Sequence, residues 1–84
     1  MIEVLFFAGL RERLGCDRVE LMLPEGVTTI QGVRRHLMDR GNGWSDALGP
    51  SERIMVALNE QLCSERAEVK PGDRLALFPP VTGG

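Results

Sequence analysis

The pattern of hydrophobic and polar residues along the chain predicts five short β-strands. Residues 1–8 are almost wholly apolar, which is typical of a central strand that is covered on both faces. Alternating apolar and polar residues further along the chain predict half-buried strands. These are expected at residues 19–23, 53–58, 61–63 and 74–78.

Two stretches have the spacing of an amphipathic helix. Residues 8–14 form the shorter one, and Gly15 can end it in a left-handed conformation. The longer helix is expected to begin at a capping box made by Thr28 and Gln31 and to stop at Gly41. Its apolar side consists of Ile30, Val33, Leu37 and Met38.

The stretch between Gly41 and Pro50 is rich in residues that interrupt regular structure. Three glycines and a proline within ten residues predict a surface loop, with a turn of helix near residues 45–48. Trp44 is expected to hold this loop against the domain. The Gly-Asn-Gly sequence lacks the Lys-Ser/Thr that follows in a phosphate-binding loop, so no nucleotide site is expected here.

The order of these elements predicts a two-layer α+β domain. Strands lie at both ends of the chain and one main helix lies between them, so a single sheet has to wrap that helix. The last strand must lie beside the first, because both are apolar and need burial. We therefore expect one domain over residues 1–78 and an extended tail over residues 79–84.

Composition and charge exclude several classes of function. The 84 residues carry a net charge of −2, and the basic residues are spread from Arg11 to Arg74 instead of forming a patch. With only four aromatic residues as well, a nucleic-acid-binding surface is not expected. No apolar run approaches the ~20 residues of a membrane span, and no signal peptide is recognisable, so a cytoplasmic protein is expected.

The sequence offers no obvious metal site, bound cofactor or thiol nucleophile. Cys16 and Cys63 do not form a CxxC pair, and both are expected to be reduced thiols without a catalytic partner. The alternative is a disulfide between them. His36 lies off the apolar side of the long helix and has no Asp, Glu or Cys at ligand spacing, so we expect a solvated side chain.

The final seven residues have an unusual composition for a chain end. Phe78 is followed by two prolines, which hold the backbone extended, and Gly83 and Gly84 have no side chain and fit a narrow channel. We therefore expect the carboxylate of Gly84 to be the reacting group of the protein. An inert, frayed terminus is the alternative, since a diglycine by itself is common by chance.

Three stretches resemble the ubiquitin-like sulfur carriers of the β-grasp fold, and among these the small subunits of molybdopterin synthase. They are Ile2-Glu3-Val4-Leu5-Phe6-Phe7-Ala8, Ala57-Leu58-Asn59 with Leu62, and Pro71-Gly72-Asp73 leading to Phe78-Pro79-Pro80-Val81-Thr82-Gly83-Gly84. The resemblance runs the length of the chain. It implies a β-grasp fold with about five strands around one main helix, and a short extra helix.

The resemblance also implies a reaction cycle. An activating partner of the ubiquitin-activating type consumes ATP to adenylate the Gly84 carboxylate, and a sulfurtransferase converts the product to a thiocarboxylate. The tail, Pro79, Pro80, Val81, Thr82 and Gly83, then enters the large subunit, where sulfur passes to a cyclic pterin precursor. The chain would supply sulfur and no catalytic groups, in a heterotetramer of two small and two large subunits.

A docking surface follows from the strand pattern and the family together. If Ile2, Val4 and Phe6 face the helix, then Phe7 and the neighbouring strand's Phe78 face away from it. With Leu62 they should form an exposed apolar patch, and such patches mark partner sites. The family uses the matching positions against its activating enzyme and large subunit. Alternatively, the short helix covers part of this patch.

Related functions share the same ending. The diglycine is common to carriers for thiamine synthesis and tRNA thiolation and to ubiquitin-like modifiers that are joined to lysines. Only the preceding residues 78–82 favour molybdopterin. A plain binding domain with an inert tail is the remaining alternative.

Overall fold

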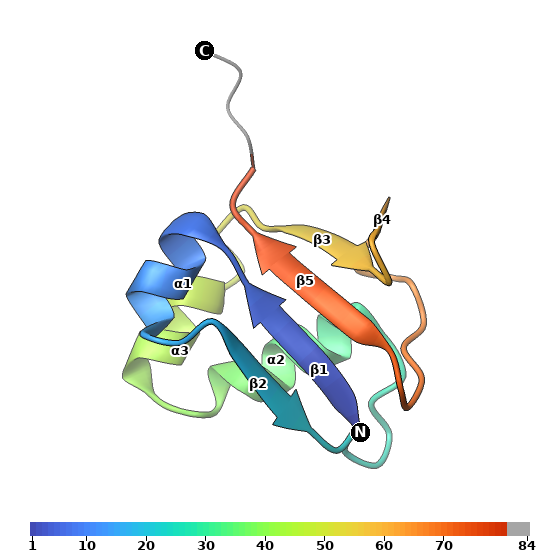
Figure 1. The fold of residues 1–84 in the computed structure, drawn as a ribbon. Helices are drawn as coiled ribbons and strands as arrows, with labels where there is room; N and C mark the ends of the chain where they lie inside the picture. The colour runs from blue at the N-terminus through green and yellow to red at the C-terminus, as the bar shows by residue number, and fades with distance from the viewer. Residues whose placement is uncertain (81–84) are drawn as a thin grey trace.

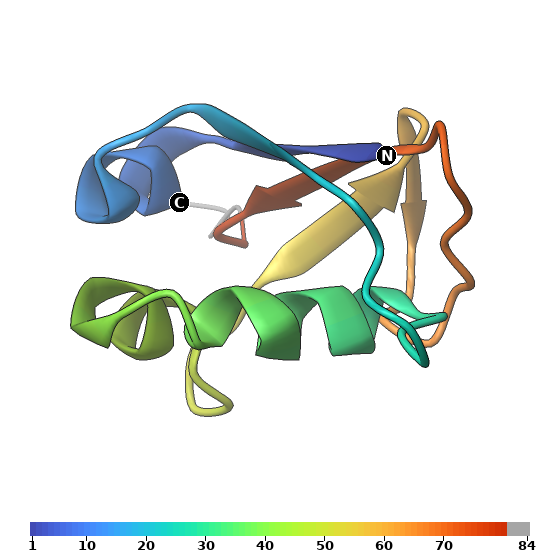
Figure 2. The same ribbon diagram turned by 90° about the horizontal axis from the view of Figure 1, so that it is seen from below.

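The computed structural model describes residues 1–80 of the chain, apart from the side chain of Asn42. One five-stranded sheet forms the upper layer in Figure 2, with α2 and α3 beneath it and α1 beyond one end. The strands are β1 (Ile2–Phe6), β2 (Arg18–Leu21), β3 (Met55–Leu58), β4 (Gln61–Cys63) and β5 (Arg74–Phe78). The helices are α1 (Ala8–Leu14), α2 (Ile30–Met38) and α3 (Asn42–Leu48).

The sheet is mixed, with the strand order β2-β1-β5-β3-β4 (Figure 1). β5 lies parallel to β1 and antiparallel to β3, while the β1–β2 and β3–β4 pairs are antiparallel. The prediction that the last strand lies beside the first is therefore confirmed, as is the α+β class. Since β1 and β5 run the same way, their carboxyl ends meet at the same end of the sheet (Figure 1).

The core lies between the sheet and α2. Ile2, Val4 and Phe6 of β1 are buried, whereas Leu5 between them is half-buried and the next residue, Phe7, is exposed. The prediction that residues 1–8 are covered on both faces was therefore wrong. The helices within residues 1–80 all lie on one side of the sheet or beyond its end, so none of them covers its other face, called the open face below (Figure 2).

The start of α2 differs from the predicted capping box by one residue. Thr29, not Thr28, is the N-cap, and its hydroxyl oxygen accepts a hydrogen bond from the Gly32 amide at 3.2 Å. The backbone carbonyl of Thr28 instead accepts a hydrogen bond from Val69 at 2.9 Å. Tertiary pairing with the segment before β5 thus decides which of two adjacent threonines begins the helix.

The predicted loop at residues 41–50 is in fact largely the seven-residue helix α3, so the fold has two short helices and not one. Gly41, expected to stop α2, is the N-cap of α3 and has a φ of 154°, which favours glycine. Trp44 packs edge-to-face against Phe6, with ring centroids 5.5 Å apart. The prediction that Trp44 holds this segment to the domain is confirmed.

Several tight turns of the fold use backbone with positive φ. Gly15 ends α1 with a φ of 72°, the left-handed value expected of it. Asn59 and Glu60 join β3 to β4 with φ values of 49° and 72°, which suit a two-residue hairpin turn. Gly72 has a φ of 94° in the turn before β5, as a type II turn requires.

Within residues 1–80, no helix is long and apolar enough to cross a bilayer.

Candidate docking face and tail exit

The open face of the sheet carries a continuous row of outward residues from one edge to the other. Cross-strand partners point to the same side of a sheet. Leu62 of β4 lies opposite Ala57 of β3, and Ala57 lies opposite Ala76 of β5. Ala76 in turn lies beside Leu5 of β1. At the β2 edge the row ends in Arg18, opposite Leu5. The open face is therefore apolar across four strands.

Phe7 and Phe78 lie at the tail end of this face. Phe6 and Leu77 are register partners on the parallel strands, and both are buried against the helix layer. The next residue on each strand must turn to the other side. Phe7 is held there by its amide, which donates to the Leu77 carbonyl at 3.2 Å.

The three predicted docking residues are accessible to different extents. Leu62 is 68% exposed and Phe7 is 47% exposed, while Phe78 is half-buried. The structure thus brings these residues to one open face, and α1 leaves Phe7 exposed. Their role in binding a partner stays a prediction.

Met55 belongs to the same face and was not predicted as part of it. It lies opposite Phe78 in the β3–β5 pair and is 40% exposed. The alternation of residues 53–58 already indicated that Met55 and Val56 face opposite sides. What the sequence does not reveal is the strand order, and only that order brings Met55 beside Phe78.

A charged group borders the apolar row. Glu3 of β1 accepts from Arg18 at 2.9 Å through one carboxylate oxygen and from Arg74 at 2.8 Å through the other. The register places Arg74 directly beside Glu3 on β5 and Glu20 opposite it on β2. We call Arg18, Glu3 and Arg74 the arginine–glutamate triad.

The tail leaves the domain at the end of the sheet where Phe7 lies (Figure 1). Pro79 and Pro80 are half-buried after the end of β5. The remaining predicted tail residues, Val81, Thr82, Gly83 and Gly84, lie outside the described residues. The predicted boundary between residues 78 and 79 also remains a prediction.

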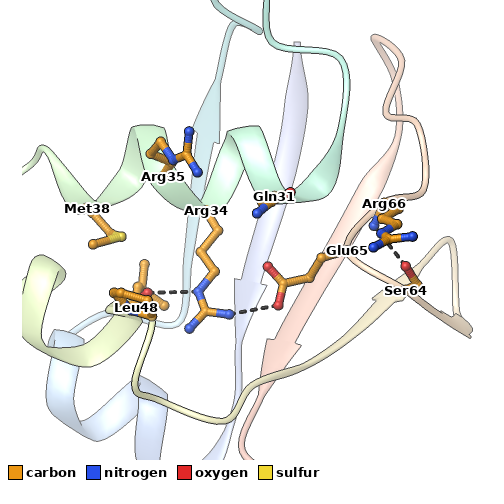
Figure 3. Close-up of a pocket in the computed structure, with 9 residues that line it drawn as sticks. Gln31, Arg34, Arg35, Met38, Leu48, Ser64, Glu65 and Arg66 are labelled. Carbon is orange, nitrogen blue, oxygen red and sulfur yellow. Dashed lines mark hydrogen bonds and ion pairs between the residues drawn. The ribbon is translucent and has the colours of Figure 1, made fainter.

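The other side of the molecule has a groove of about 490 Å³ between α2 and the segments on either side of β3 and β4 (Figure 3). Arg34 lies at its floor with a side chain only 11% exposed. Its guanidinium donates to the carbonyls of Leu48, Gly49 and Glu52 at 2.8, 2.7 and 2.8 Å. It also pairs with the Glu65 carboxylate at 2.7 Å.

This groove is built around a structural clamp. Leu48 and Gly49 are at the carboxyl end of α3, where carbonyl groups have no partner within the helix. Arg34 supplies those partners from α2, 14 and 15 residues away in sequence. These contacts already use most of the guanidinium donors of Arg34, which sequence reasoning did not single out.

A second polar cluster holds the opposite end of β5. Asp73 accepts from the side-chain amide of Asn59 at 3.0 Å and from the backbone amide of Lys70 at 2.8 Å. The Asn59 amide, followed by the Lys70 amide, lowers the pKa of the Asp73 carboxyl below its usual value. Asn59 also accepts from the Arg74 amide at 2.9 Å, so the β3–β4 turn is fastened to β5.

The thiols and the histidine are dispersed. Cys16 and Cys63 are both free and half-buried, so the alternative of a disulfide between them is not what the structure contains. His36 is exposed on α2. Among residues 1–80 there is no cluster of three or more potential metal ligands.

Comparison with known proteins agrees with this architecture. The sequence matches the ThiS family over residues 4–84. It is 43% identical to the molybdopterin synthase sulfur carrier subunit of Haemophilus influenzae, over the full length of both chains. In structure it is similar to SAMP1 from Haloferax volcanii, with a TM-score of 0.75, 29% identity and coverage of 99% and 98% of the two chains.

A second similar structure is a complex. It is the complex of subunits 1 and 2 of molybdopterin-converting factor from Helicobacter pylori. The matching chain has a TM-score of 0.66 and 27% identity, and the match covers 99% of this chain and 97% of that one. The family match, the full-length relative and the five-stranded sheet around α2 lead to one conclusion: this chain belongs to the ThiS family and has the β-grasp fold.

Proposed function

We propose that this chain is the sulfur carrier subunit of a molybdopterin synthase. The observation that carries the proposal is the 43% identity over all 84 residues with a carrier subunit of that name. The open apolar face and the Pro-Pro and Gly-Gly tail supply the parts such a carrier needs. These are a surface for docking and a thin segment that can enter a partner's active site.

The chemistry follows from the Gly84 carboxylate. A carboxylate is a poor acyl donor because an oxide ion is a poor leaving group. The Gly84 oxygen therefore attacks the α-phosphorus of ATP, releasing pyrophosphate and forming an acyl-adenylate. A sulfurtransferase cysteine persulfide then attacks the acyl carbon through its outer sulfur and releases AMP, which leaves an acyl disulfide. A second thiol attacks the sulfurtransferase sulfur of this disulfide, forms a new disulfide with it and releases the thiocarboxylate.

The catalytic groups belong to the partners in this proposal. The charged residue nearest to Gly84 in the sequence is Arg74, ten positions earlier. Stabilisation of the charge that develops during adenylation and sulfur transfer must then come from the activating enzyme and the large subunit. The chain acts as a substrate of the first and a sulfur donor within the second.

Docking on the large subunit would use the open face. The Helicobacter pylori relative forms a complex between two subunits of molybdopterin-converting factor. We infer an equivalent complex here, in which Phe7, Leu62 and Phe78 contact the large subunit. Pro79, Pro80, Val81, Thr82 and Gly83 would then lead Gly84 to the pterin precursor, in an assembly of two small and two large subunits.

Intact-mass measurement tests this function. The chain is incubated with ATP, the activating enzyme of its own organism, a sulfurtransferase with its sulfur donor, and a thiol reductant. We expect a single product, heavier by the mass difference between a sulfur and an oxygen atom and absent without ATP. Ladders of protein conjugates would instead indicate a ubiquitin-like modifier. An unchanged mass would contradict a carrier of any kind.

A further inference from the structure

The charged border of the open face carries exposed guanidinium N–H groups that make no hydrogen bond to the described residues. We propose that Arg18 and Arg74, held in place by Glu3, bind carboxylates at the rim of the large subunit's docking site. This inference rests on the proposed function, because the large subunit is the partner it concerns. It adds a chemical property of that partner: an apolar centre with acidic groups along one border.

The geometry of the triad fixes both arginines on the docking side. Arg18 and Arg74 lie on the two strands next to Glu3. Each donates a hydrogen bond to a different oxygen of the Glu3 carboxylate, at 2.9 and 2.8 Å respectively. The Glu3 side chain is only 22% exposed, whereas those of Arg18 and Arg74 are 58% and 60% exposed. The carboxylate is thus the covered anchor, and the guanidinium groups face solvent.

The arginines retain unused donors. A guanidinium has five N–H groups in a planar fork that matches a carboxylate. In the described part of the chain, each of these two side chains is fixed through a single bond to Glu3. Arg34 is different, because its guanidinium donates hydrogen bonds to three carbonyls and a carboxylate. The exposed forks of Arg18 and Arg74 are therefore available to a partner and already oriented.

Stability alone does not account for this arrangement. Exposed ion pairs contribute little to the free energy of folding. The β1–β2 register also sets Glu20 directly opposite Glu3, and like charges in that position are unfavourable. The two arginines offset this repulsion around Glu3. Their forks nevertheless point away from the core, onto the open face.

Position relative to the apolar residues makes the triad part of the same surface. Arg18 continues the row that runs from Leu62 through Ala76 to Leu5. Arg74 is two residues before Ala76 on the same strand, so it lies on the same face. A partner that covers the apolar row must therefore also approach both guanidinium groups. Charged groups at a rim mainly set association rate and orientation.

The test measures association of the purified chain with the large subunit of the same organism, at low and high ionic strength. Arg18→Gln and Arg74→Gln should each lower the association rate constant roughly 3- to 10-fold at low salt. The difference should shrink at high salt because the interaction is screened. Arg66→Gln, an exposed arginine on the groove side, is the control of equal charge change.

The Glu3→Gln variant is decisive, because the proposal predicts that its association rate changes in the opposite direction. It removes the carboxylate that neutralises both arginines, so association at low salt should become faster than for the unmodified chain. A triad that only supported the fold would give slower binding or none in all three variants. Arg18→Gln and Arg74→Gln variants that bind like Arg66→Gln would overturn the proposal and leave the proposed function intact. Failure of the unmodified chain to bind the large subunit would overturn both.

Discussion

Met55 and Phe78 lie directly opposite each other across the antiparallel β3–β5 pair, on the face of the sheet that α1, α2 and α3 leave uncovered. This pairing ties the last residue of the final strand to an exposed thioether 23 positions earlier in the sequence. Phe7 lies beside them on the parallel side, where its backbone amide donates a hydrogen bond to the Leu77 carbonyl. The tail thus starts where three large apolar side chains gather.

Phe6 and Phe7 offer a matched pair of substitutions for this face. Phe7→Ala should weaken binding to the large subunit by about 2 kcal/mol, because an aromatic anchor of an interface is lost. Its free energy of unfolding should fall by less than about 1 kcal/mol, since the side chain is 47% exposed. Phe6→Ala should cost about 3–5 kcal/mol of folding stability, because Phe6 is buried. Calorimetric titration and urea unfolding give the two quantities. Normal binding by Phe7→Ala would show that the partner does not use this residue.

Arg34 should be the main stabilising side chain of the α2–α3 contact. Arg34→Met should lower the free energy of unfolding by about 2–4 kcal/mol, since it leaves carbonyls and the Glu65 carboxylate without their partner. Arg35→Met makes the same change one residue away, at an exposed position, and should cost less than about 0.5 kcal/mol. Urea unfolding measures both. Equal losses would contradict the clamp.

The Asp73 cluster predicts a specific sensitivity to acid. Hydrogen bonds from Asn59 and Lys70 lower the pKa of Asp73 in the folded state below the ordinary value of 3.8. The ionised form therefore contributes stability above that ordinary value, and this contribution is lost as the pH falls through the lower, folded-state pKa. Asn59→Gly removes the amide but tolerates the positive φ of this position. Its unfolding free energy should fall less than that of the unmodified chain between about pH 7 and about pH 2.

Asp73→Asn is the control for this experiment, because it has no carboxyl group to titrate at that position. Its acid sensitivity should be reduced at least as much as that of Asn59→Gly, because in Asn59→Gly the Lys70 amide still lowers the pKa of Asp73. If both variants lost as much stability as the unmodified chain over this pH range, the interaction between Asn59 and Asp73 would not be the cause.

Deleting Gly84 should abolish sulfur loading and leave folding unchanged. The reacting carboxylate would then be displaced by one residue along the tail, away from the site that activates it. The core elements β1, α2 and β5 all end before the tail and do not depend on it. Intact mass after incubation with the activating system reports loading, and thermal unfolding reports the fold. Normal thiocarboxylate formation on the truncated chain would remove Gly84 from the mechanism.

Much of the fold was predictable because local patterns agree with the tertiary structure. The alternation in residues 74–78 and the apolar run at 1–8 predict two strands that need burial, and the structure pairs them. Pro71, Gly72 and the Asn59-Glu60 pair also specify their turns locally. The open face follows from the same alternation, once a single helix layer is recognised.

The remainder depends on contacts that are distant in sequence. α3 contains Gly43 and follows Gly41, so helix propensity argues against it. It forms because Ala47 and Leu48 are buried, Trp44 packs on Phe6, and Arg34 satisfies its last carbonyls. Likewise, Met55 and the arginine–glutamate triad join the candidate site only through strand order. The complete strand order is not apparent from the sequence alone.

Transfer of sulfur from the loaded chain tests the central claim most directly. The thiocarboxylated chain is mixed with the large subunit and the cyclic pterin precursor, and both protein mass and pterin products are followed. We predict that the chain returns to the mass of its carboxylate form only when both components are present, while a dithiolene-bearing pterin appears. Retention of sulfur under these conditions, with release instead to a thiamine-forming or tRNA-thiolating system, would contradict the assignment to molybdopterin synthase.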